Sequence, residues 1–180
     1  MAESIFITHT KRWIADVVIG SNFCPYASKV FLQNKIYYDV YSSITLSNLL
    51  DQVKYIFYLL NNKPNIETAF LIFDAYNISF SKYLVELAKA EKLLKKSGYE
   101  GVYQIASFHP QYVFAGSNDN DAANFTNRSP YAMFHFLREA SVSKVVDNYK
   151  DISSITAHNI KFASDKGVLY FEQLLQNCKL

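Results

Sequence analysis

The sequence predicts an α/β fold: a small, mainly parallel sheet of three or four strands covered by helices, with a helical C-terminal third. Segments with helical apolar spacing alternate with short runs rich in β-branched and aromatic residues as far as Phe108. The connections between these runs are long enough to be helical crossovers, and strands joined in this way are usually parallel. We therefore expect three strands that run in one direction, with helices packed over them.

The first part of the chain predicts a helix, a strand and a second helix. Residues 6–18 carry apolar side chains at helical spacing, and Gly20, which tolerates a positive φ, marks the expected helix end. Residues 36–41 are dense in tyrosine and β-branched residues and predict a strand. Residues 46–60 carry apolar side chains throughout at the i, i+3, i+4, i+7 spacing of a helix, and Thr45 is available as the N-terminal cap.

The next part predicts a strand, a helix and a third strand. Residues 69–73 form a continuous apolar run, which is the pattern of a strand covered on both faces, so we expect it at the centre of the sheet. Residues 80–94 form an amphipathic helix that ends at Lys95, Lys96 and Gly98. Residues 101–108 predict the third strand.

The segment after Phe108 contains a long loop followed by helices. Residues 109–127 contain no long periodic element apart from a short helix expected at 121–125, and loops of this length in compact domains are usually functional. Pro130 fits the first position of a helix capped by Ser129, which we expect to run to about residue 149. Two further helical stretches are expected around 155–162 and 168–178.

Length and composition restrict the class of protein. The 180 residues predict a single domain, 1–180, and 50% hydrophobic residues supply a packed core. With 18 basic and 16 acidic residues, the net charge of +2 is too small to predict a nucleic-acid partner. No uncharged apolar run is long enough to span a bilayer, so we expect no membrane partner either.

The cysteines and the N-terminus predict a cytoplasmic location. Cys24 and Cys178 form neither a disulfide framework nor a zinc-binding spacing, which favours a reducing compartment. Glu3 stands where a secretory signal needs positive charge. The 14 tyrosines, 14 phenylalanines and one tryptophan exceed what one core is expected to hide, which predicts a homodimer.

Two cationic or titratable side chains are expected on an apolar helix face. On a helix that starts at Ser129, His135 and Arg138 share an arc with apolar residues. A buried guanidinium without a partner costs several kcal/mol, so we expect an anion beside Arg138. This anion is either the carboxylate or phosphate of a ligand, or an internal acid: Asp74, Asp119, Asp121 or Glu139. The remaining alternative is that this arc of the helix faces solvent.

The predicted site is one pocket for a small anionic molecule. Ligands in open α/β sheets bind beyond the carboxyl ends of the strands, and free amides at a helix N-terminus attract anions. The pocket is expected to combine residues from the third strand end, the long loop and the following helix: His109, Arg128, Ser129, His135 and Arg138. Arg128 and Arg138 would hold the anion, and His109 or His135 would move protons near neutral pH. Asn127 and Ser129 would orient the ligand.

Cys24 is the one strong nucleophile among the candidates. It precedes Pro25 and is able to cap a short helix, which would lower its thiol pKa; the competing interpretation is a buried, inert cysteine. The predicted topology places Cys24 toward the opposite sheet edge from His109, so a pair of these two as nucleophile and base is the less favoured hypothesis. A metal site is conceivable from His109, Asp119, Asp121 and His135, because imidazole and carboxylates suit zinc, manganese or iron. Their spacing is not diagnostic, so we assign no metal ligand, and the sequence specifies no cofactor.

Three motifs carry a family resemblance that covers nearly the whole chain. They are Asn22-Phe-Cys-Pro-Tyr-Ala27, Ala106-Ser-Phe-His-Pro-Gln-Tyr-Val-Phe-Ala-Gly116 and Asn124-Phe-Thr-Asn-Arg-Ser-Pro-Tyr131, the last followed by His135 and Arg138. The chain resembles an uncharacterised bacterial domain family of unknown function. The resemblance implies that one characteristic set contains Cys24, His109, Asn127, Arg128, Ser129, His135 and Arg138.

The chain departs from the family pattern at three positions. Tyr26 stands where phenylalanine is usual, Ala132 where proline is common, and Gln111 where an acid is frequent. The last departure argues against a role that needs a carboxylate beside His109. The family implies no reaction, so two functions remain. The first is an enzyme, such as a hydrolase or transferase, or a binder, that acts on a small anionic ligand. The second is a non-catalytic interaction or sensor domain whose histidine and arginine network is structural.

Overall fold

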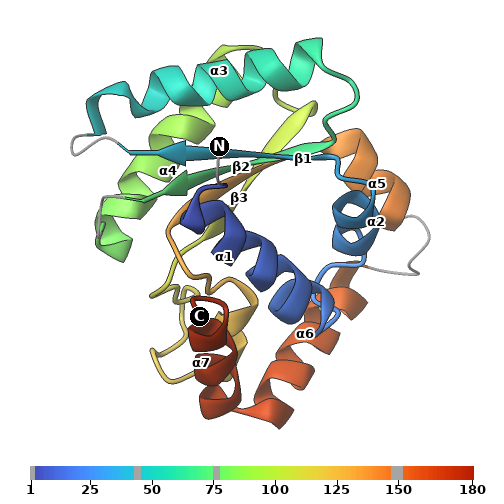
Figure 1. Cartoon of the computed structure of the whole chain (residues 1–180), viewed down its shortest axis with the longest axis vertical. Helices are drawn as coiled ribbons and strands as arrows, with labels where there is room; N and C mark the ends of the chain where they lie inside the picture. The colour runs from blue at the N-terminus through green and yellow to red at the C-terminus, as the bar shows by residue number, and fades with distance from the viewer. Residues whose placement is uncertain (1–2, 43–45, 75–77, 147–151) are drawn as a thin grey trace.

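The computed structural model describes residues 3–42, 46–74, 78–146 and 152–180. Its centre is a four-stranded sheet with helices on both faces (Figure 1). The strand order is β1-β2-β4-β3, where the strands are β1 (Ile36–Tyr41), β2 (Thr68–Phe73), β3 (Tyr103–Phe108) and β4 (Met133–Arg138). The three predicted strands are therefore present, and the continuous apolar run became β2, an internal strand that is buried along its whole length.

The sheet is mixed, so the prediction of a mainly parallel sheet is wrong. β1 pairs with β2 in parallel, whereas β4 lies between β2 and β3 and is antiparallel to both. Because β2 and β3 both oppose β4, the three strands β1, β2 and β3 still run in one direction. The additional strand separates β3 from β2 and replaces their expected direct pairing.

The error arises at residues 129–149, which do not form one helix. Residues 133–138 are β4, and a helix, α5 (Glu139–Val146), starts immediately afterwards. The strand reads Met-Phe-His-Phe-Leu-Arg, and four of its six residues are buried. A short, nearly continuous apolar run is compatible both with a strand covered on two faces and with a buried helix. Here the pairing of these residues with β2 and β3 determines that they form a strand. The expected helix end near residue 149 lies outside the described residues.

Helices cover the two faces of the sheet as separate groups. One face packs against α3 (Leu49–Asn62) and α4 (Phe80–Lys96). The other face packs against α1 (Ile5–Trp13) and the π-helical turn η1 (Ile14–Ile19), and the C-terminal helices α6 (Ile152–Lys166) and α7 (Val168–Asn177) lie beyond them, as Figure 1 shows. Alternate residues of β2 and β4 point into the two cores: Leu71 and Phe134 into the first, Phe70 and Met133 into the second.

Three short elements complete the chain. They are α2 (Ala27–Leu32), the 3₁₀ turn η2 (Leu46–Asn48) before α3, and the 3₁₀ turn η3 (Ala122–Thr126), which corresponds to the short helix expected in the long loop. Thr45, the predicted helix cap, lies outside the described residues. Among the described residues, none of the helices has the length and apolar character needed to cross a membrane.

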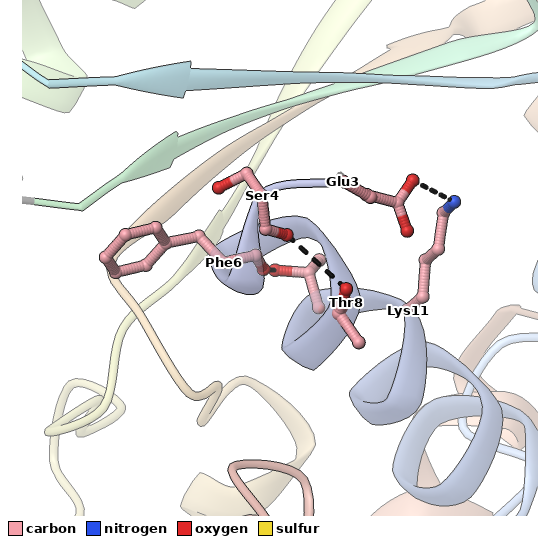
Figure 2. Close-up of polar contacts among 6 residues, drawn as sticks. Glu3, Ser4, Phe6, Thr8 and Lys11 are labelled. Atoms are coloured by element: carbon pink, nitrogen blue, oxygen red, sulfur yellow. Dashed lines mark hydrogen bonds and ion pairs between the residues drawn. The ribbon is translucent and has the colours of Figure 1, made fainter. Parts of the chain in front are cut away.

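The ends of the first helical segment are fixed locally. Figure 2 shows Lys11 reaching back to Glu3, 2.6 Å away, and Thr8 donating a hydrogen bond to the carbonyl of Ser4. At the other end the helical segment stops at Ile19, so the expected helix end at Gly20 is confirmed, and Gly20 itself has φ −59°. A Cβ at Gly20 would lie 2.3 Å from the carbonyl oxygen of Asp16, so glycine is needed there for a close backbone approach.

Candidate ligand-binding hollow

A cavity of about 210 Å³ lies against the sheet face that carries Phe70 and His135. We call it the inner chamber. Its wall is mostly apolar, and α1, η1 and α2 contribute Trp13, Ile14 and Val30 to it. The sheet contributes eight further side chains: Ile36, Thr68, Phe70, Gln104, Ala106, Phe108, His135 and Leu137.

A second cavity of about 530 Å³ lies between the long loop, η3 and α6. We call it the outer chamber. Its wall includes six polar side chains: Ser117, Asp121, Thr126, Asn127, Thr156 and Asn159. Both chambers are lined by Val18, Cys24, Ala106 and Phe108, so they adjoin along this common wall. The two together, called the hollow below, offer an apolar end and a polar end.

His135 reaches the inner chamber because strand residues alternate between the two faces of a sheet. It pairs in register with Phe70 of β2 and Ala106 of β3, which lie on the same face. The imidazole stacks on the Phe70 ring with 3.8 Å between the ring centroids. Burial lowers the His135 pKa to about 3, so the imidazole is neutral near neutral pH.

Thr68 fixes the proton on the His135 ring. The Thr68 hydroxyl donates its single proton to the carbonyl of Phe136, 2.5 Å away. The same hydroxyl lies 2.6 Å from His135 Nε2, and without a second proton it acts there as the acceptor. Nε2 therefore carries the hydrogen, which leaves Nδ1 as an acceptor that bonds to no other group in the described residues. The structure thus assigns the Nε2–H tautomer.

Cys24 lies in the common wall of the two chambers. The turn that precedes α2 contains Asn22 with φ 54°, a left-handed conformation that asparagine tolerates. Burial raises the pKa of the Cys24 thiol, and the nearby backbone N–H groups of Tyr26 and Ala27 lower it by less. The net result is a protonated thiol, which favours the interpretation of an inert cysteine over activation by a helix end.

Alkylation of the native protein is expected to modify Cys24 on the order of ten times faster than Cys178. Cys24 is half-buried and lines a cavity, whereas Cys178 is fully buried and donates to the carbonyl of Leu174. The rate should increase with pH because only the thiolate reacts. Mass spectrometry of peptides after iodoacetamide treatment measures both sites, with denatured protein as the control. Faster labelling of Cys178 would contradict this placement of Cys24.

The ligand-orienting residues predicted in the long loop are divided. Asn127 lines the outer chamber and donates through Nδ2 to the carbonyl of Ser107, 3.0 Å away. Ser129 is buried away from both chambers and donates to the carbonyl of Tyr131. Only Asn127 therefore contributes to the hollow.

Arg128 holds the long loop together. Its Nε donates to the carbonyl of Tyr112 at 3.1 Å and one terminal nitrogen to the carbonyl of Asp119 at 2.8 Å. The guanidinium also lies over the Phe125 ring, 4.6 Å from its centroid. These contacts direct the positive charge into the loop and not into either chamber.

His109 lies outside the hollow with both ring nitrogens engaged. Nε2 is 2.9 Å from the carbonyl of Ile78 and donates to it, and Nδ1 accepts a hydrogen bond from the backbone of Gln111 at 3.0 Å. The ring is 2% exposed, and this burial lowers the pKa of His109. Its proposed role in proton transfer stays a prediction, for which this geometry offers no open nitrogen.

Arg138 lies on the opposite face of the sheet from His135, so the expected common arc is wrong. Positions three apart on a strand point to opposite faces, whereas on a helix they share one. The guanidinium donates to the carbonyls of Leu60 and Ile66 and lies 3.4 Å from the hydroxyl of Tyr103. The anion expected beside Arg138 is therefore replaced by carbonyl oxygens in the last turn of α3 and in the segment before β2.

The hollow consequently contains Cys24, Asn127 and His135 out of the residues predicted for the site. The predicted five-residue pocket is not formed, because His109, Arg128, Ser129 and Arg138 lie elsewhere: the first three in loops and the last on the other face. Within the described residues, no group of three or more His, Cys, Asp or Glu side chains is arranged to hold a metal ion.

Sequence reasoning missed Thr68 and Asn159. Thr68 is the polar residue directly before the apolar run of β2, a position that the sequence does display. Asn159 donates through Nδ2 to the carbonyl of Phe23 at 2.8 Å, and its Oδ1 is buried without a hydrogen-bond partner in the described structure. Nothing in the sequence around Asn159 indicates that it lines a cavity.

Comparison with known proteins identifies the family. A family model described as "Protein of unknown function (DUF1415)" matches residues 5–173, which is most of the chain. The chain belongs to the DUF1415 family. This membership confirms the resemblance to an uncharacterised family, and it assigns no activity. No curated protein and no solved structure matches the chain.

Proposed function

We propose that this DUF1415 protein binds a small organic molecule in the hollow, with an apolar part of the ligand in the inner chamber. The observation that carries the proposal is the inner chamber itself: a mostly apolar cavity of about 210 Å³ in whose wall His135 Nδ1 is an open acceptor. Small-molecule sites typically combine an apolar wall with a few polar groups that orient the ligand. An apolar protein cavity of about 150 Å³ is large enough for benzene, so the inner chamber has room for a six-membered ring.

The His135 ring in the wall of the inner chamber favours a ligand that donates a hydrogen bond. His135 is neutral and its Nε2–H is already bonded to Thr68, so the ring offers only the acceptor Nδ1. In the described part of the chain, neither chamber is lined by lysine or arginine. The small anionic ligand predicted from sequence has not been tested, and the hollow supplies no cation to support it.

The neutral compound phenylpropanol is expected to bind the hollow and stabilise the protein. At a concentration of about 100 times Kd, a ligand that binds only the folded state adds about 2.7 kcal/mol to the free energy of unfolding, and for a chain of this size it raises Tm by roughly 5 °C or more. Thermal unfolding and calorimetric titration measure this effect. The ring provides the apolar part and the hydroxyl provides the donor.

Filling the common wall should remove the effect. Ala106→Leu adds volume where the two chambers meet, and Ala88→Leu makes the same change at an exposed position of α4. We expect no phenylpropanol binding in the first variant and unchanged binding in the second. Equal binding by both variants, or no binding by the unmodified protein, would rule out the hollow as the site.

An enzyme that uses Cys24 as nucleophile is the second candidate function. The observation in its favour is that Cys24 and His135, whose Nδ1 is open, line the same chamber. Against it, a base with a pKa of about 3 is weak, and burial raises the pKa of the thiol that must lose the proton. A burst of one equivalent of nitrophenol from nitrophenyl acetate, lost in both Cys24→Ala and His135→Gln, would favour this enzyme over a binding protein.

A further inference from the structure

We infer that the outer chamber binds an organic ammonium group, so that the ligand of the hollow is an amine with an apolar tail. This inference rests on the proposed function, because the tail occupies the inner chamber. It names the chemical class of the ligand, which the apolar wall alone does not. Three features of the outer chamber carry it: an oxygen without a partner, a carboxylate and a set of aromatic rings.

The first feature is the side-chain oxygen of Asn159. The Nδ2 group of this amide donates to the carbonyl of Phe23, which fixes the orientation of the amide and identifies the other atom as the oxygen. That oxygen is buried and has no hydrogen-bond partner in the described structure. Buried acceptors are nearly always bonded, so this one calls for a donor from a bound molecule.

The second feature is the carboxylate of Asp121. One oxygen accepts from the backbone N–H of Ala123 at 2.9 Å, and the other accepts from the hydroxyl of Ser117 at 2.8 Å. These hydrogen bonds lower the pKa of Asp121, so the group is ionised near neutral pH. Each oxygen has a second lone pair for a further donor. In the described part of the wall, Asp121 is the one residue with a formal charge.

The third feature is the aromatic part of the wall. Phe23, Phe108 and Phe114 line the outer chamber together with Asp121. Aromatic faces attract ammonium groups through their quadrupole, and organic ammonium ligands are commonly bound by such rings. An ammonium group supplies up to three donors for the oxygens of Asn159 and Asp121, whereas a carboxylate ligand would meet a like charge and supply none.

Three probes with the same ring and chain test the inference: phenylpropylamine, phenylpropanol and phenylpropionate. Calorimetric titration is expected to give the order amine, alcohol, acid, with the amine at least about tenfold tighter than the alcohol. Asp121→Asn should reduce the preference for the amine to near parity, since asparagine keeps the acceptor for Ala123 and loses the charge. Asp119→Asn, the same change at an exposed residue that does not line the chamber, should leave the preference intact.

The outcomes separate the two proposals. Equal affinity for the amine and the alcohol, or tighter binding of the acid, overturns the ammonium inference and leaves the proposed function standing. Absence of binding by all three probes overturns both. Because Asp121→Asn could disturb η3, salt provides a second measurement on the unmodified protein: the affinity for the amine should fall as ionic strength rises, and the affinity for the alcohol should not.

Discussion

Lowering the pH from about 7 to about 4 is expected to remove about 3 kcal/mol from the free energy of unfolding through His135 alone. The folded protein holds the His135 pKa at about 3, compared with an ordinary value of 6.5, because the imidazole is buried. Between these values the unfolded chain binds more protons than the folded one, so stability falls as the pH falls. The contribution of His135 to the free energy of unfolding is complete above about pH 6.5 and is lost progressively as the pH falls toward 3.

Urea unfolding at a series of pH values measures this dependence. His135→Gln removes the titrating group, so its free energy of unfolding should change less steeply over the acid range. His158→Gln is the matched control because His158 is exposed on α6. Burial also lowers the pKa values of His9 and His109, so some acid dependence should remain in the His135 variant. An unchanged slope in His135→Gln would show that the imidazole is not buried as described.

Arg138→Met is expected to lower the free energy of unfolding by about 3 kcal/mol, because hydrogen bonds from a charged donor contribute roughly 1.5–3 kcal/mol each. The guanidinium donates to the carbonyls of Leu60 and Ile66. These hydrogen bonds connect β4 to the end of α3 and to the segment between α3 and β2. Methionine keeps the aliphatic length and leaves these oxygens without their donor. Chemical denaturation measures the loss.

Arg12→Met provides the control for Arg138, since Arg12 is exposed and surface changes usually alter stability by less than about 0.5 kcal/mol. The Arg138 variant should still bind phenylpropanol, because Arg138 lies on the face of the sheet opposite the hollow. Equal stability of both variants would contradict the structural role. Loss of phenylpropanol binding in folded Arg138→Met would instead indicate that Arg138 takes part in ligand binding.

The order of the first elements was predictable because each has a strong local signal. The apolar spacing of residues 46–60 and the cations and glycine that end α4 are local signals, because they lie within or next to the helices that they specify. β4 has no such signal. Its apolar run is equally suited to a helix, and the preceding Ser129-Pro130 pair is typical of a helix start, so only contact with β2 and β3 specifies a strand.

The candidate site was predictable in its residue types and only partly in its geometry. Cys24, Asn127 and His135 do reach one hollow from three distant segments. The partners of Arg128 and Arg138 are backbone carbonyls, which every residue possesses and no sequence pattern distinguishes. The side-chain types therefore predict an anion at positions where the fold supplies main-chain oxygens.

The insertion of β4 between β2 and β3 also affects how the chain is completed during synthesis. When the ribosome has released only the first three strands, β1 and β2 are able to pair, but β3 has no partner until residues 133–138 emerge. Until then the open edges of β2 and β3 are sites for pairing with other chains. We therefore expect nascent chains that lack β4 to associate with other chains more readily than the complete protein does.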